Sequence, residues 1–132
     1  MAVDRDAAKI RQGRDAAKGW SLSVEWVEAD LERSWPDLGQ FDVVLLFNYL
    51  DRARMAQVNR SVRAGGVLMF ETYLEIQRQL GWGPQQEAHL LKFGEILSLV
   101  APLVMIRGRE AFEPADNAQW AAMASILARK PK

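Results

Sequence analysis

The stretch that most restricts the fold is the run Phe41–Phe47, which reads FDVVLLF. It is almost continuously apolar and rich in residues that favour β-structure. Such a run is typical of a strand in a parallel sheet, because helices cover both faces of a sheet of that kind. We therefore expect residues 41–47 to form a strand that is buried on both faces, in a protein of the α/β class.

Strands and helices are expected to alternate along the chain, with turn-forming residues between them. Asp6 is suited to cap a helix that ends at Gly19. Asp51 is expected to begin an amphipathic helix that ends at the Gly65–Gly66 pair. The other expected elements are strands over residues 22–27, 67–73 and 103–112, and a helix over residues 93–101.

Two segments have a less regular pattern. Residues 74–92 contain glycine and proline, which predicts a long loop with some helix, and loops of this length often cover a site. In residues 118–129, the spacing of Trp120, Met123 and Leu127 favours a helix when the segment is considered by itself.

Length and composition restrict the class of protein. A chain of 132 residues with 49% hydrophobic and 26% charged residues predicts one folded domain over residues 1–132. Seventeen basic residues balance 17 acidic ones, so we expect no nucleic-acid partner. The chain has no cysteine, and no metal site is predicted. The longest apolar region, residues 96–106, is interrupted by Ser98 and Pro102, so we expect a cytoplasmic protein without a membrane partner.

Three polar residues follow predicted strands. They are Asp4, Asp30 and Asn48. In a doubly wound α/β sheet, ligands bind beyond the carboxyl ends of the strands. We therefore expect these three side chains to lie near one edge of the sheet.

The order and spacing of these segments resemble class I methyltransferases that depend on S-adenosylmethionine (SAM), most closely the small bacterial tellurite-resistance-like and generic methyltransferase domains. The resemblance implies a Rossmann-like, mostly parallel sheet with a C-terminal antiparallel hairpin. Its final strand would include residues 124–131, in place of the helix that local spacing favours. The segments that carry the resemblance are AVDRD at 2–6, VEADLE at 27–32, FDVVLLFNYLDR at 41–52, VRAGGVLMFETY at 62–73 and the stretch at 81–100.

The chain departs from the family pattern in one respect. The family begins with a strand that leads into a Gly-x-Gly-x-Gly turn, where the backbone approaches the cofactor closely. No such pattern occurs in this sequence, so the first βα unit, roughly 30 residues, is expected to be missing. The resemblance implies SAM-dependent methyl transfer to a small-molecule acceptor, with catalysis incomplete in this chain alone.

The resemblance also implies which residues bind the cofactor. Asp4 would accept hydrogen bonds from the ribose hydroxyls, and Asp30 from the adenine amino group. Leu31 would contact the adenine ring, and Phe47 would lie by the reactive end of the cofactor. From the residues alone, Asp4 is equally suited to begin a helix and Asp30 to lie in a solvated turn.

The candidates for catalysis are Asn48, Tyr49 and His89. Asn48 or Tyr49 would orient the acceptor by hydrogen bonding, although Tyr49 is equally suited to the core. His89 is the only histidine, and its ordinary pKa near neutrality makes it a candidate base. Glu71 and Glu87 are candidates to meet a cationic substrate, or are solvated charges.

A missing first strand has a structural consequence. In the family that strand lies between the second and the fourth, so its absence leaves residues 41–47 without a neighbour. Unpaired strand groups favour pairing with other chains, so we expect either direct closure of the sheet or a homodimer of C2 symmetry.

The alternative function is a non-enzymatic relic of the fold that forms oligomers or binds proteins. A nicotinamide-dinucleotide domain is a third interpretation, but it requires the same glycine turn.

Overall fold

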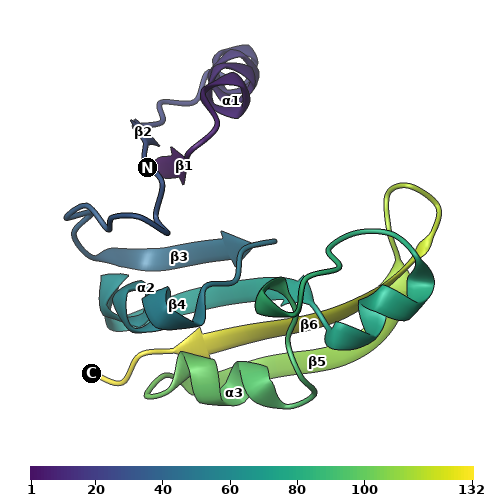
Figure 1. Ribbon diagram of the computed structural model, residues 1–132. Helices are drawn as coiled ribbons and strands as arrows, with labels where there is room; N and C mark the ends of the chain where they lie inside the picture. The colour runs from purple at the N-terminus through teal and green to yellow at the C-terminus, as the bar shows by residue number, and fades with distance from the viewer. The chain divides into compact units, whose positions relative to one another are not determined.

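The computed structural model describes residues 1–132 and divides them into two compact units, Met1–Asp37 and Leu38–Lys132 (Figure 1). The prediction of a single domain over residues 1–132 stays a prediction. None of the helices is both long enough and apolar enough to span a lipid bilayer.

The first unit is one helix between two short parallel strands. Strand β1 (Ala2–Asp4) pairs with β2 (Trp26–Glu28), and α1 (Ala7–Gly19) connects them. The predicted cap is confirmed, because the Asp6 carboxylate accepts hydrogen bonds from the first turn of α1. Gly13 allows the Trp26 indole to approach α1, since a Cβ at this position would overlap the ring.

Strand β2 is shorter than predicted. The expected strand covered residues 22–27, whereas β2 begins only at Trp26. The reason is the length of its partner, because β1 offers three residues and pairs Ala2 with Trp26 and Asp4 with Glu28. The backbone hydrogen bonds extend one residue further, since the Glu25 carbonyl oxygen accepts from the Ala2 N–H at 2.8 Å, and residues 22–24 have no strand beside them.

The second unit is built on a four-stranded sheet in the order β3-β4-β6-β5. β3 and β4 are parallel, while β6 is antiparallel to both of its neighbours. This arrangement confirms the C-terminal antiparallel hairpin. The sheet is mixed rather than mostly parallel as predicted, because only one of its three strand pairs, β3 with β4, is parallel. The strands are β3 (Phe41–Phe47), β4 (Val62–Tyr73), β5 (Val104–Pro114) and β6 (Trp120–Arg129).

Near the C-terminus the family resemblance predicted a strand, whereas the local spacing favoured a helix. The structure has a strand there, so the prediction from resemblance is confirmed. β6 has backbone partners on both sides, so its pairing outweighs the helical preference of an alanine-rich segment. Small side chains suit this central position, and Ala122, Ala124 and Ala128 are fully buried.

Helix α2 (Met55–Ser61) ends earlier than predicted, because Val62 already begins β4. Lys130 stabilises this end by donating from Nζ to the carbonyl oxygens of Asn59 (3.2 Å) and Val62 (2.7 Å). Cations are favourable at helix C-termini, where carbonyl groups lack partners within the helix. The expected stop at Gly65–Gly66 is therefore wrong, and β4 continues through both glycines.

The prediction that β3 is buried on both faces is wrong. Val43, Leu45 and Phe47 are 54%, 58% and 51% exposed. β3 lies at the edge of the sheet and has one partner, β4. Figure 1 shows α2 and α3 (Glu95–Val100) against one face of this sheet, which is the face where Leu68 and Phe70 of β4 are buried. The exposed side chains of β3 lie on the other face.

The segment between β4 and α3 is a loop with short 3-10 helices, as predicted. They cover Glu75–Leu80 and Glu87–His89, and a third, Arg52–Arg54, precedes α2. The loop is fixed to the sheet by Gln77, which is fully buried. Its Oε1 accepts from the Ala122 N–H at 2.8 Å, and its Nε2 donates to the Trp82 carbonyl at 3.0 Å.

Replacing Gln77 by Leu is expected to destabilise the second unit by about 1–3 kcal/mol, because the buried N–H of Ala122 would lose its acceptor. Urea denaturation followed by circular dichroism measures this free energy of unfolding. Gln79→Leu is the matched control, since Gln79 is exposed in the same 3-10 helix. Equal stability of the two variants would contradict the role of Gln77.

Candidate functional site

The carboxyl end of the first parallel pair brings two predicted site residues together. Asp4 is the last residue of β1 and is in register with Glu28 of β2. The N–H of Ala29 donates to the Asp4 carbonyl at 3.0 Å, and Asp30 follows directly. Asp4 and Asp30 therefore lie at the same edge of the β1–β2 pair, as predicted, while Asn48 belongs to the second unit.

Both carboxylates are half-buried and already organised by backbone N–H groups. Asp4 Oδ1 accepts from the N–H of Asp6 at 2.8 Å, and Asp4 Oδ2 has no hydrogen-bond donor. Asp30 Oδ1 accepts from the N–H of Glu32 at 3.1 Å, while Oδ2 lies 3.6 Å from Arg33 Nε. Because carboxylates only accept hydrogen bonds, this edge is suited to a ligand with hydroxyl or amino donors. Leu31, also half-buried, lies next to these acceptors in the sequence.

The carboxyl end of β3 carries the predicted residues of the second unit. Phe47 is in register with Glu71 of β4, and the Asn48 N–H donates to the Glu71 carbonyl at 2.9 Å. Asn48 has a φ of 53°, in the left-handed region that asparagine tolerates better than most residues. The backbone turns sharply here, so Asn48 is exposed while Tyr49 is half-buried.

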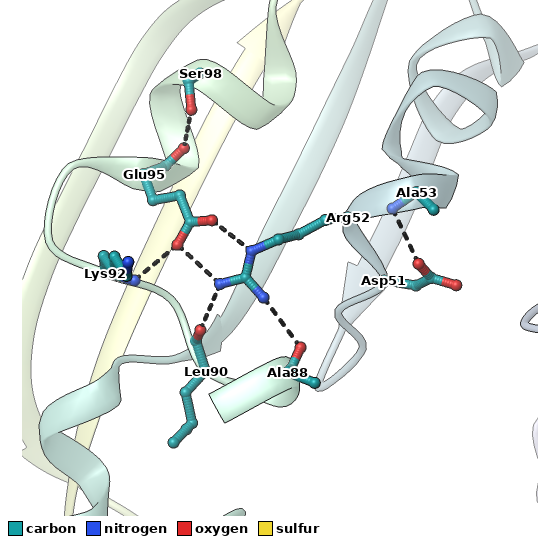
Figure 2. A network of polar contacts seen from close by, with 8 residues as sticks. All are labelled: Asp51, Arg52, Ala53, Ala88, Leu90, Lys92, Glu95 and Ser98. Carbon is teal, nitrogen blue, oxygen red and sulfur yellow. Dashed lines mark hydrogen bonds and ion pairs between the residues drawn. The ribbon is translucent and has the colours of Figure 1, made fainter. Parts of the chain in front are cut away.

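A cluster of charges lies just beyond this point and surrounds an open cavity of about 350 Å³. Figure 2 shows its central contact, in which Arg52 meets Glu95 at the start of α3. Arg52 Nε donates to Glu95 Oε1 at 2.6 Å, and an Nη donates to Oε2 at 3.0 Å. The cavity is lined by Arg52, Glu87, Ala88, Lys92 and Glu95.

Arg52 acts as a clamp between two segments that are distant in sequence. Besides Glu95, it donates to the carbonyl oxygens of Ala88 (3.2 Å) and Leu90 (2.8 Å) (Figure 2). A guanidinium has five N–H donors, and these contacts use most of them. The hydrogen bond from Arg52 lowers the pKa of Glu95, and the same bond raises the pKa of Arg52. The charges in the cavity with no such partner are those of Glu87 and Lys92.

The remaining candidates lie apart from this contact. His89 is exposed in the 3-10 helix Glu87–His89 and does not line the cavity. Glu71 is half-buried on β4. The pair of Arg52 and Glu95 was not identified from the sequence, because 43 positions separate them and no local pattern links the two. The only signal was the Asp51 cap, which is confirmed by its bond from the Ala53 N–H.

No protein-family model matches the chain. No curated protein matches it by sequence either. Solved structures do match. TehB from Haemophilus influenzae superposes with a TM-score of 0.77 at 12% identity, over 97% of this chain and 48% of TehB. The chain thus spans about half the length of TehB.

Two further structures support the same fold. The N-methyltransferase NodS from Bradyrhizobium japonicum gives a TM-score of 0.72 at 15% identity, over 98% of this chain and 72% of NodS. A SAM-dependent methyltransferase from Clostridium acetobutylicum gives a TM-score of 0.74 at 12% identity, over 99% of this chain and 74% of that protein. The chain has the Rossmann-like α/β fold of class I SAM-dependent methyltransferases, as predicted.

The contact between Arg52 and Glu95 predicts a dependence of stability on pH. The pKa of Glu95 is lower in the folded chain than in the unfolded one, so its contribution is fully present above about pH 4.3, the ordinary glutamate value. It is lost as the pH falls from there toward the folded-state pKa. We expect Glu95→Gln to cost on the order of 1 kcal/mol at pH 7 and progressively less below pH ~4.3.

Urea denaturation at a series of pH values measures this difference. Asp116→Asn is the control, because Asp116 is exposed and has no ion pair. A cost of Glu95→Gln that stays constant down to pH ~2 would show that the ionised carboxylate does not stabilise the fold.

Proposed function

We propose that this chain binds SAM, or its product S-adenosylhomocysteine, as part of methyl transfer to a small-molecule acceptor. One observation carries the proposal, which is the placement of Asp4 and Asp30 at the same carboxyl edge of parallel strands in a chain with the methyltransferase fold. NodS, which shares this fold at 15% identity, has been solved in complex with S-adenosylhomocysteine.

The chemistry of the first unit fits the adenosine part of the cofactor. The free Oδ2 of Asp4 would accept from a ribose hydroxyl, while Oδ1 keeps its bond from Asp6. The carboxylate of Asp30 would accept from the adenine amino group, and Leu31 would supply an apolar contact to the ring. Both carboxylates need only donors, and the adenosine edge supplies them.

The second unit offers residues for the reactive end of the cofactor and for the acceptor. Phe47 would contact the cofactor, and Asn48 or Tyr49 would orient the acceptor from the carboxyl end of β3. We keep these two as the leading candidates over His89, whose exposed position on a 3-10 helix gives it no partner that would hold it against a substrate.

The cofactor supplies a methyl group on a sulfonium, and transfer is an in-line displacement. The protein's part is therefore alignment and exclusion of water, and a misplacement of about 1 Å costs on the order of a hundredfold in rate. We propose that residues 1–132 lack the first βα unit of the fold. The absence of a Gly-x-Gly-x-Gly turn and the separation of β1 and β3 into different sheets support this. Adenosine binding would then be retained, with the methionine end poorly held.

Calorimetric titration with S-adenosylhomocysteine tests the proposal. We expect saturable binding to the wild-type chain and binding about ten- to a hundredfold weaker to Asp4→Asn, because a charged acceptor is replaced by a neutral one. Asparagine keeps an oxygen for the N–H of Asp6, so the turn is preserved. Asp30→Asn is expected to weaken binding in the same way.

Asp15→Asn serves as the matched control, since Asp15 is exposed on α1 and its carboxylate makes no hydrogen bond or ion pair. Its affinity should equal that of the wild type. No heat at millimolar ligand, or an equal loss in all three variants, would reject cofactor binding through this edge.

A further inference from the structure

The charged cavity of the second unit lies on the side of the sheet where β3 and β4 end. Arg52 belongs to the short segment that follows β3. The wall formed by residues 87–92 returns to the end of β4, where the Leu91 N–H donates to the Tyr73 carbonyl at 2.9 Å. Ligands of α/β sheets bind beyond the carboxyl ends of the strands. The cavity therefore lies beyond Asn48, on the side where the acceptor is proposed to bind.

Two of the four charges in this cavity neutralise each other and have few contacts left to offer. Arg52 donates twice to the Glu95 carboxylate and twice to backbone carbonyl oxygens, so four of its five N–H groups are taken. Glu95 accepts a third hydrogen bond from the Lys92 N–H at 2.8 Å. The clamp of Arg52 and Glu95 is thus a closed neutral pair, and a ligand has to be recognised by the other two charges.

Glu87 and Lys92 carry the two free charges. Both residues are exposed, and neither forms an ion pair with the other or with a third group. Glu87 is followed by Ala88, whose carbonyl accepts from Arg52, whereas the Lys92 N–H bonds to Glu95 (Figure 2). The free carboxylate therefore lies on the Arg52 side of the clamp, and the free ammonium lies on the Glu95 side.

The electrostatic effects of the two free charges agree with this order. The hydrogen bond to Glu95 is the largest cause of the raised pKa of Arg52, and the charge of Glu87 raises it further. The same hydrogen bond is the largest cause of the lowered pKa of Glu95, and the charge of Lys92 lowers it further. Each free charge is therefore close to the clamp residue of opposite sign, and the four charges alternate in sign across the cavity.

The size and the lining of the cavity restrict what it can hold. Its volume of about 350 Å³ is at the lower end of small-molecule sites, which range over roughly 300–1,000 Å³. Four of its five lining residues are charged, so an apolar ligand would find little to contact. A ligand with a single charge would match one of the free charges and leave the other unmatched. A ligand that carries both an ammonium and a carboxylate matches the two together.

We propose that this cavity binds the zwitterionic part of the methyl acceptor, with its ammonium at Glu87 and its carboxylate at Lys92. The clamp lies between these two positions, so the charged groups of the ligand are separated by several bonds. The reacting atom belongs to another part of the acceptor, and remote binding energy of this kind serves to align it. The inference rests on the proposed function only for the role of the ligand as acceptor, since binding of the zwitterion itself needs no cofactor.

Titration of the wild-type chain with 6-aminohexanoate, followed by ¹H–¹⁵N NMR spectra, tests this site. We expect saturable shifts of the Ala88 and Lys92 amides with a dissociation constant on the order of 10 mM, because exposed ion pairs contribute little each. Pentylamine and hexanoate, which keep one charge each, should bind about two- to fivefold more weakly. No saturation up to about 100 mM, or equal affinities for the three probes, would overturn the proposal.

Substitutions locate the binding. Glu87→Gln and Lys92→Gln are each expected to weaken 6-aminohexanoate binding about two- to fivefold. Asp116→Asn and Lys132→Gln are the matched controls, because both residues are exposed charges of the same unit outside the cavity. The double variant Glu87→Lys with Lys92→Glu keeps both charges in reverse order and should bind the probe in the opposite direction, whereas Glu87→Lys alone should not bind it. Equal effects of the cavity and control variants, or no rescue in the double variant, would contradict the site.

The outcomes for the cavity and for the cofactor edge are distinguishable. If S-adenosylhomocysteine binds and 6-aminohexanoate does not, the zwitterion site is rejected while the proposed cofactor edge stands. If the probe binds with the expected dependence on charge and S-adenosylhomocysteine does not, the site stands and its role in methyl transfer is rejected.

Discussion

Parallel pairing of strands is the constraint on which the functional part of this chain depends. Strands that run the same way end at one edge, so residues far apart in sequence are brought together there without any contact between their side chains. β1 and β2 do this for Asp4 and Asp30, and β3 and β4 do it for Phe47 and Glu71. The chemistry available at each edge follows from which residues happen to succeed the strands.

The second unit is held together by its two central strands, β4 and β6. β4 supplies the only partner of β3, and β6 separates β4 from β5. Elements outside the sheet attach to the same pair. Gln77 reaches the backbone of β6 at Ala122, and Lys130, just after β6, binds the end of α2. The charged clamp of Arg52 and Glu95 adds a link between the chain after β3 and the start of α3.

Local sequence signals predicted those features that depend on neighbouring residues. The caps at Asp6 and Asp51 and the strand over 41–47 were all found, because each is specified within a few positions. The strand β6 was not predicted by its own periodicity. Only the family resemblance identified it, since its β-structure comes from pairing on both sides.

Features that depend on distant residues were missed. The end of α2, where β4 begins, is stabilised by Lys130 from the far end of the chain. Glu95 contacts Arg52 only in the folded unit. The exposure of β3 also could not be predicted from the sequence. An apolar run has the same residue pattern whether or not other strands and helices cover it in the fold. Roles of the site residues in binding stay predictions, while the edge that Asp4 and Asp30 share is a feature of the structure.

The convergence of Asp4 and Asp30 on one ligand is tested most directly by amide shifts in ¹H–¹⁵N NMR spectra during titration with S-adenosylhomocysteine. The amides of residues 4–6 and 29–32 are expected to shift together along a single binding curve. Absence of shifts in both segments, or shifts in one segment only, would contradict a shared cofactor edge.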